Sequence, residues 1–182
     1  MLILASKSPR RKKLLSKIVS DFKIIPASID ERLLDPSLNP KDLAKEESKL
    51  KAYDIFSKYP NDEVLSCDTI VILDSKALEK PSSEKEAKEM LLAEQGRKQI
   101  VLSAYTYLSK DKEITRTVST EVYFNSLSEE EIEDYIKRFK PFDKAGSYGI
   151  QDDYPLIQKI VGSYDNVMGL PTEDLRLHVF KR

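Results

Sequence analysis

The pattern of apolar and polar positions along the chain predicts strands that alternate with helices. Apolar or strictly alternating runs predict strands at 2–5, 22–26, 63–73, 99–108, 114–124 and 156–161. Helices are predicted from residue 9, from 40 to about 58, from 83 to about 96, from 128 to about 139, and after residue 171. Residues 109–112 read as a hairpin turn, and 141–151 as a glycine-containing loop. The order indicates an α/β domain with a mixed sheet, in which two lobes around a cleft fit the length.

Four predicted helices begin at a residue whose side chain can accept a hydrogen bond from the first turn. These capping residues are Ser8, Asn39, Ser83 and Ser128. Glu86 and Glu131 follow the last two at the spacing of a capping box. The helix after Asn39 has an imperfect apolar period, and its apolar markers are Leu43, Leu50 and Ile55.

The first twelve residues predict an anion site. A short apolar strand leads into Ser6 and Ser8, and the helix that follows carries Arg10 and Arg11 in its first turn. Free N–H groups, a helix dipole, hydroxyls and guanidiniums would meet there, which suits phosphate. First-turn arginines oppose the helix dipole, and a bound anion would reverse that effect. The alternative, an ordinary capped surface helix, stays open on these residues alone.

Composition narrows the classes of function. The 182 residues carry a net charge of −1, whereas a general nucleic-acid binder would need a basic excess. No apolar run approaches the roughly 20 residues of a membrane span, and the first residues lack the pattern of a signal peptide. We therefore expect a single globular domain over residues 1–182 in the cytoplasm, with no nucleic-acid or membrane partner.

The scarcity of cysteine and histidine limits the chemistry. Cys67 is the only cysteine and His178 the only histidine, which excludes an intrachain disulfide and a cysteine-based zinc cluster. A nucleophilic triad would have to rest on His178, close to the end of the sequence. The chain also lacks the glycine-rich phosphate-binding motifs. Carboxylates, lysines, arginines and a hard metal ion are left as the candidate chemical groups.

Asp68 is the most informative single residue. It interrupts an apolar strand, and strand alternation places it on one face with Val64, Ser66, Ile70 and Ile72. An ionised carboxylate there is costly unless it is paired or metal-bound. We interpret Asp68 as a catalytic carboxylate at the floor of the cleft; the alternative is a strand-end aspartate that caps a turn. Cys67, on the opposite face, is interpreted as a core residue.

Other charged residues could complete a phosphate and metal site. Glu31 follows Asp30 in a polar loop, and with Asp68 it is a candidate ligand of Mg²⁺ or Mn²⁺. These ions usually take one or two carboxylates plus substrate phosphates. The candidate cations are Lys51, Lys80 and Lys144, of which Lys144 lies in the glycine-containing loop.

Several short motifs occur together in this chain. They are S-x-S-P-R-R at 6–11, Asp30-Glu31, Lys51-Ala52, Cys67-Asp68-Thr69, Lys80-Pro81, Gly96-Arg97, D-K-A-G-x-Y-G-I-Q at 143–151 and N-V-M-G-L-P at 166–171. In order and spacing they resemble the Maf family of nucleotide pyrophosphatases over nearly the whole chain. The first motif and the one at 143–151 are the specific ones.

The resemblance implies a fold, an activity and a set of residues. It implies a twisted mixed sheet with flanking helices, of the Maf and ITPase type, with two lobes around a cleft. The implied activity is metal-dependent hydrolysis of nucleoside triphosphates to monophosphate and pyrophosphate, with Asp68 as proton acceptor. The residues implied to line the site are Ser8, Arg11, Glu31, Lys51, Lys80 and Lys144. Arg10, Thr69 and Gln151 resemble the subgroup that acts on dTTP and UTP.

Departures from the family pattern affect substrate preference more than fold. Glu79 and Asp152 stand where the family usually has glycine, and both add negative charge near an anion site. Ser66-Cys67 replaces the usual Gly-Ala. The choice of Lys51 over Lys49 rests on spacing alone.

Two classes of function remain after these residues are considered. One is a pyrophosphatase, and the other is a nucleotide-binding regulatory module linked to cell division, a role implied by some relatives. A carboxylate kept in an apolar strand that faces an anion favours the enzyme. Whether the chain forms a homodimer is left open.

Overall fold

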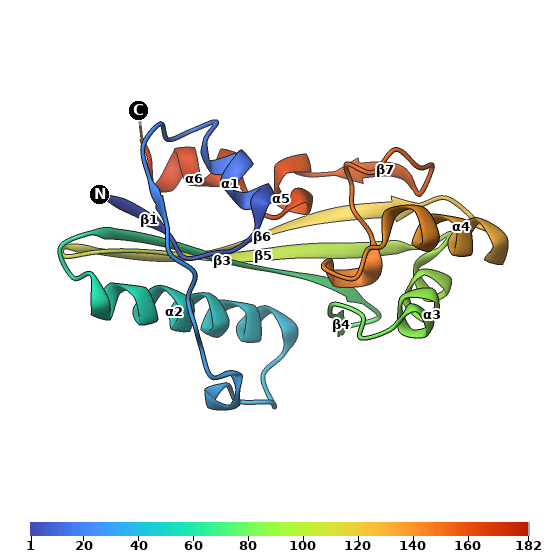
Figure 1. Cartoon of the computed structure of the whole chain (residues 1–182), viewed down its shortest axis with the longest axis horizontal. Helices are drawn as coiled ribbons and strands as arrows, with labels where there is room; N and C mark the ends of the chain where they lie inside the picture. The colour runs from blue at the N-terminus through green and yellow to red at the C-terminus, as the bar shows by residue number, and fades with distance from the viewer. Residues whose placement is uncertain (182) are drawn as a thin grey trace.

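A mixed sheet runs through the whole molecule (Figure 1). The structure is a computed structural model that describes residues 1–181, without the side chain of Glu31. Within these residues the sheet has seven strands: β1 (Leu2–Leu4), β2 (Lys23–Ile24), β3 (Glu63–Leu73), β4 (Lys76–Leu78), β5 (Lys98–Ser109), β6 (Lys112–Phe124) and β7 (Ile157–Val161). Their order is β2-β1-β3-β5-β6-β7, and β4 pairs with β3. β1 is parallel to β2 and β3, and the other pairs are antiparallel.

Helices cover both faces of this sheet. They are α1 (Pro9–Leu15), α2 (Pro40–Lys58), α3 (Glu84–Glu94), α4 (Glu129–Phe139), α5 (Tyr164–Met168) and α6 (Thr172–His178). α2 lies on one face, α1, α5 and α6 lie on the other, and α3 and α4 lie together at one end (Figure 1). Two 3-10 turns, η1 (Glu31–Leu33) and η2 (Ala145–Ser147), interrupt the connections. Within residues 1–181 no helix is long and apolar enough to cross a membrane.

The predicted helix caps are present, with one difference. Each of the four capping residues accepts a hydrogen bond from the backbone N–H three residues later. Ser128 and Glu131 form the complete capping box. The box predicted for Ser83 is only half formed, because the Glu86 carboxylate accepts hydrogen bonds from the backbone N–H and hydroxyl of Ser82 instead.

The differences from the predicted elements are in short segments. β4, α5 and both 3-10 turns were not predicted, since three to five residues are too few to show a period. β2 is only two residues long, and β6 begins at Lys112, which shortens the predicted turn to residues 110–111. The pairing of Ser109 with Lys112 closes that hairpin.

Two main core regions sit along the same long strands and form two lobes. At one end Leu14, Leu65 and Tyr105 pack together between the sheet and α1 and α6. At the other end Leu91 and Ile132 bring α3 and α4 onto the strands. Because β3, β5 and β6 run through both regions, the lobes share one sheet. The predicted mixed α/β fold with two lobes is confirmed.

The helix α2 packs on the sheet through small residues rather than through its leucines. Its buried positions are Ala44, Ser48, Ala52 and Ile55, whereas Leu43 and Leu50 are only half-buried. The Ser48 hydroxyl shares a hydrogen bond of 2.8 Å with Thr106, and its carbonyl accepts one of 2.5 Å from Ser66. Of the three apolar markers of this helix, only Ile55 is therefore fully buried. Small side chains let α2 approach β3 and β5 closely, which an apolarity period does not detect.

A larger residue in this contact should destabilise the protein. We expect Ala52→Leu to lower the free energy of unfolding by about 1–3 kcal/mol, because Ala52 is fully buried between α2 and the sheet. The control is Ala93→Leu on the exposed side of α3, which should change it by less than about 0.5 kcal/mol. Urea unfolding of both variants measures the difference, and equal stabilities would contradict the close packing.

Candidate active site

Two adjoining cavities open where the lobes meet. The same five residues line both of them: Ser8, Arg10, Arg11, Lys80 and Asp143. The first cavity continues between β3, the loop 141–151 and the end of α5, and adds Thr69, Lys144 and Gln151. The second continues toward the loop 26–29 and α2, where it adds Lys51, and its volume of about 560 Å³ is in the range that ligands occupy.

Most of the predicted site residues therefore meet in one place. The structure brings together Ser8, Arg10, Arg11, Lys51, Thr69, Lys80, Lys144 and Gln151. Asp68 lines neither cavity, but it is paired with Lys51, which lines the second. The side chain of Glu31 lies outside the described part of the structure, so its predicted metal role stays a prediction.

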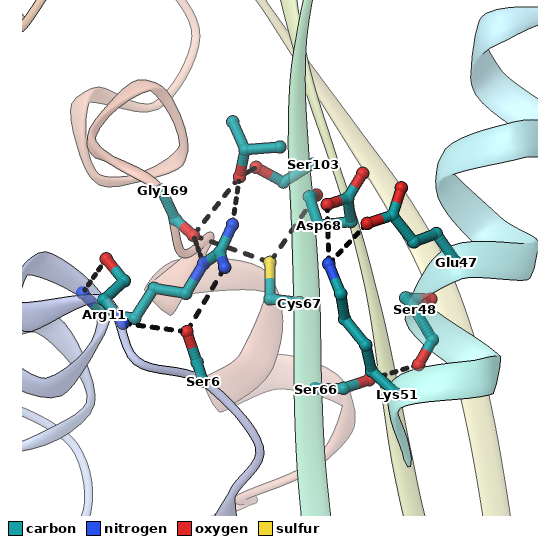
Figure 2. A network of polar contacts seen from close by, with 12 residues as sticks. Ser6, Arg11, Glu47, Ser48, Lys51, Ser66, Cys67, Asp68, Ser103 and Gly169 are labelled. Atoms are coloured by element: carbon teal, nitrogen blue, oxygen red, sulfur yellow. Dashed lines mark hydrogen bonds and ion pairs between the residues drawn. The ribbon is translucent and has the colours of Figure 1, made fainter. Parts of the chain in front are cut away.

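Arg11 is held by two distant segments of the chain and by nearby Ser6 (Figure 2). Its Nε donates to the carbonyl of Gly169 at 2.8 Å, Nη2 donates to the Thr69 hydroxyl at 3.1 Å, and Nη1 donates to Ser6 at 3.3 Å. The Thr69 hydroxyl also shares a hydrogen bond of 2.8 Å with Ser103 on β5. The guanidinium therefore has a fixed position at the wall of the first cavity, and it joins α1 to β3 and to the end of α5.

Asp68 lies on the opposite face of β3, toward α2 (Figure 2). The Lys51 Nζ is 3.1 Å from Asp68 Oδ1 and 2.6 Å from Glu47 Oε1. The Asp68 side chain is 13% exposed, so its charge is largely removed from water and is paired. The face predicted from alternation is confirmed, because Ser66 also bonds to α2 whereas Cys67 and Thr69 bond on the other side.

Lys51, not Lys49, is the lysine beside Asp68. Burial, the largest influence, lowers the pKa of Lys51, but the charges of Asp68 and Glu47 outweigh it and the net shift is upward. Lys51 therefore stays a cation at neutral pH. Lys49 instead pairs with Glu46 at 3.1 Å and lines a separate groove beside Leu33 and Leu34.

Cys67 is a core residue, as expected. Its side chain is fully buried, and its Sγ lies 3.5 Å from the carbonyl oxygen of Gly169. Burial raises the pKa of this thiol, which opposes formation of a nucleophilic thiolate.

A carboxylate that the sequence analysis did not single out lies among the cations. Asp143 is 3.1 Å from Arg10 Nη1 and 3.1 Å from Lys144 Nζ. Burial is the largest single influence on Asp143 and raises its pKa. The hydrogen bonds and charges of Lys144 and Arg10 together lower the pKa by more, so the net shift is downward. The ionised Asp143 thus links α1 to the loop 141–151, at a point where two cations could also bind the oxygens of a phosphate.

Glu79 and Asp152, the two acidic residues that depart from the family pattern, do not line the cavities. Glu79 is exposed, and neither it nor Asp152 belongs to either lining. The Asp152 carboxylate instead accepts a hydrogen bond of 2.6 Å from the hydroxyl of Tyr135 on α4. The Asp152 carboxylate is therefore bound to α4 and lines neither cavity.

The carboxylates near Lys51 suit a hard cation that a substrate would help to coordinate. Asp68 and Glu47 converge on the position that the Lys51 ammonium occupies, so a metal ion would bind beside Lys51 or in its place. Among residues 1–181, with the Glu31 side chain left aside, no group of three or more His, Cys, Asp or Glu could hold a metal alone. Mg²⁺ is typically held by one or two carboxylates together with substrate phosphates, and this donor set fits that arrangement.

Several site residues were missed by the sequence analysis. They are Glu47, Ser103, Asp143 and the backbone carbonyl of Gly169. Asp143 could have been found, since it is the first residue of the specific motif at 143–151. The carbonyl of Gly169 leaves no sequence signal, because any residue supplies one.

The family model and the relatives that are similar in sequence match nearly the whole chain. Residues 1–180 match the family described as Maf-like protein. A dTTP/UTP pyrophosphatase of Thermococcus gammatolerans is 41% identical over 95% of this chain and 92% of its own length. The protein of the same name from Thermosipho africanus is 46% identical, over 93% and 87%. The solved Ham1 protein of Staphylococcus aureus overlaps 68% of this chain and 71% of its own, at 14% identity and a TM-score of 0.47, too little to carry an argument.

The contacts of Arg11 predict a role in stability as well as in binding. We expect Arg11→Ala to lower the free energy of unfolding by about 2–3 kcal/mol, because it removes hydrogen bonds from a charged donor to three segments. Arg10→Ala is the control; it removes one partly exposed ion pair and should cost less than about 1 kcal/mol. Denaturant unfolding distinguishes them, and an Arg11 variant as stable as the wild type would show that these contacts contribute little.

Proposed function

The chain belongs to the Maf family, and on that basis we propose that it hydrolyses nucleoside triphosphates, dTTP and UTP in particular, to the monophosphate and pyrophosphate. The observation that carries the proposal is identity of about 40% or more, over nearly the full length, to proteins named dTTP/UTP pyrophosphatase. The protein is thus a hydrolase of phosphoric anhydrides. The regulatory alternative has no separate observation in its favour.

The two cavities suggest how a nucleotide would lie. The first, with Thr69 and Gln151, would receive the base, and the second, with Lys51, would receive phosphates. The Gln151 amide can both donate and accept hydrogen bonds, which matches the mixed pattern on the edge of uracil or thymine. The shared residues Arg10, Arg11 and Lys80 would then bind the phosphates at the junction of the two cavities.

Asp68 is the proposed proton acceptor for the attacking water. As the water oxygen bonds to the inner phosphorus, its proton passes to a carboxylate oxygen of Asp68, and the bond to the bridging oxygen breaks. Lys51 holds Asp68 in place through the 3.1 Å ion pair. The nearby cations, Lys80 and Lys144 among them, would stabilise the charge that develops on the pyrophosphate.

The proposed cofactor is Mg²⁺ or Mn²⁺. Asp68 and Glu31, the ligands expected from the sequence, would hold it with the phosphates of the substrate, and Glu47 is the carboxylate that lies beside Asp68 on Lys51. When bound, such an ion polarises the phosphate and lowers the pKa of a bound water. A cytoplasmic location also stays a prediction from the sequence.

The products of hydrolysis test the proposed function directly. We expect the purified protein to release pyrophosphate and monophosphate, with no diphosphate intermediate, and to act on dTTP and UTP better than on ATP and GTP. A nucleotide panel with separate assays for pyrophosphate and phosphate measures this. Stepwise release of single phosphates, or a preference for purines, would contradict the proposal.

Removing the proposed proton acceptor should slow the reaction without abolishing binding. Asp68→Asn keeps the shape of the side chain, and we expect kcat to fall by about 10²–10⁴-fold. Titration with a non-hydrolysable UTP analogue should show binding largely retained. The control is Asp62→Asn, which removes a surface ion pair with the N-terminal amine. Near-normal turnover in folded Asp68→Asn would refute the assignment.

Metal dependence is the third test of this site. Exhaustive chelation should abolish pyrophosphate release, and Mg²⁺ or Mn²⁺ should restore it, because the proposed donors are carboxylate and phosphate oxygens. Zn²⁺ should not be required, since the chain has one cysteine and one histidine. Full activity after chelation would show that the carboxylates act without a metal ion.

A further inference from the structure

Gln151 lies in a short turn whose two ends bind the same hydroxyl group. The turn spans residues 149–152 and is closed by a backbone hydrogen bond of 3.1 Å from Asp152 N to the carbonyl of Gly149. The Tyr135 hydroxyl accepts a hydrogen bond of 3.0 Å from Gly149 N and donates one of 2.6 Å to Asp152 Oδ2. One side chain of α4 therefore fixes both ends of the turn that carries Gln151.

Tyr135 itself is held rigidly. Its side chain is fully buried, and its ring stacks on Phe139 at 5.1 Å between centroids and packs on Tyr154 at 5.4 Å. Burial, and then the bond to Asp152, raise the pKa of the Tyr135 hydroxyl, so it keeps its proton and stays a donor to the carboxylate. The turn is thus anchored to the hydrophobic core of its lobe through a buried side chain.

The opposite side of the turn is equally restricted. A Cβ atom at Gly149 would lie 2.8 Å from Asp152 Oδ2 and 2.9 Å from Lys144 Cε. Glycine permits this approach, which packs the stem of Lys144 and the Asp152 carboxylate against the turn. Lys144 and Gln151 both line the first cavity, whereas Tyr135 and Asp152 do not. A shift of the turn would therefore move two cavity residues together.

We propose that Tyr135, acting through Asp152, is a positioning residue that sets how Gln151 meets the base and so contributes to nucleotide preference. The proposal rests on the proposed function, since it concerns the same site. It also accounts for an aspartate at position 152, where the family usually has glycine: the carboxylate accepts a hydrogen bond from the Tyr135 hydroxyl and holds the end of the turn.

The test is the Tyr135→Phe variant, assayed by pyrophosphate release with dTTP, UTP and GTP. Loss of the hydroxyl should raise KM for dTTP and UTP by about 3–10-fold, equivalent to one hydrogen bond, with kcat within about twofold. The KM for GTP should change less, so the preference for pyrimidines narrows. The matched control is Tyr107→Phe, which removes a 2.7 Å bond from a buried tyrosine to Glu63, away from both cavities.

Variants at Asp152 separate positioning from general packing. Asp152→Asn keeps an acceptor for the Tyr135 hydroxyl and should preserve the preference, whereas Asp152→Ala should behave as Tyr135→Phe. If Tyr135→Phe does not fold, the comparison of Asp152→Asn with Asp152→Ala tests the proposal. The same pyrimidine preference in these two variants would overturn it. An equal fall in kcat for all three nucleotides would also overturn it, as would a preference that survives Tyr135→Phe. A wild-type protein that releases no pyrophosphate would instead overturn the proposed function.

Discussion

Consecutive residues of β3 point to opposite faces of the sheet, and the site depends on that alternation. Thr69 and Cys67 meet Arg11 and the end of α5 on one face, and Asp68 meets Lys51 of α2 on the other. Adjacent positions of β3 therefore contact different elements on the two faces of the sheet. A shift of one residue in the pairing of β3 with β5 would exchange these sets and bury Asp68 against the α1 side.

Paired charges keep the site organised. Lys51 is held by Asp68 and Glu47, while Arg10 and Lys144 meet at Asp143. Such pairing reduces the cost of placing cations in partly buried positions, where an unpaired charge would be strongly destabilising. Arg10 and Asp143 lie where the two cavities join, Lys144 lines the first cavity and Lys51 lines the second.

The two lobes contribute differently to this arrangement. The first supplies Arg11 and Lys51 from helices that pack directly on the sheet, one through hydrogen bonds and the other through the small residues of α2. The second supplies Lys144 and Gln151 from a loop, and that loop is attached to the aromatic core of α4 through Tyr135. The cavity residues of the first lobe are therefore positioned by helix packing, and those of the second by the anchoring of one loop.

Local signals in the sequence determined the helix starts, the long strands and the face on which Asp68 lies. Capping residues and strand alternation depend on only a few neighbouring positions. The structure confirms the caps at Ser8 and Ser128 and the face of β3 on which Asp68 lies. The motifs also predicted the positively charged residues that line the cavities, such as Arg11, Lys80 and Lys144. What only the tertiary structure decided are contacts between distant segments: Arg11 with Gly169, Asp143 with Arg10, and Lys51 rather than Lys49 with Asp68. These depend on how closely α2 approaches the sheet and on where the loop 141–151 is anchored, and neither distance is encoded in a local pattern.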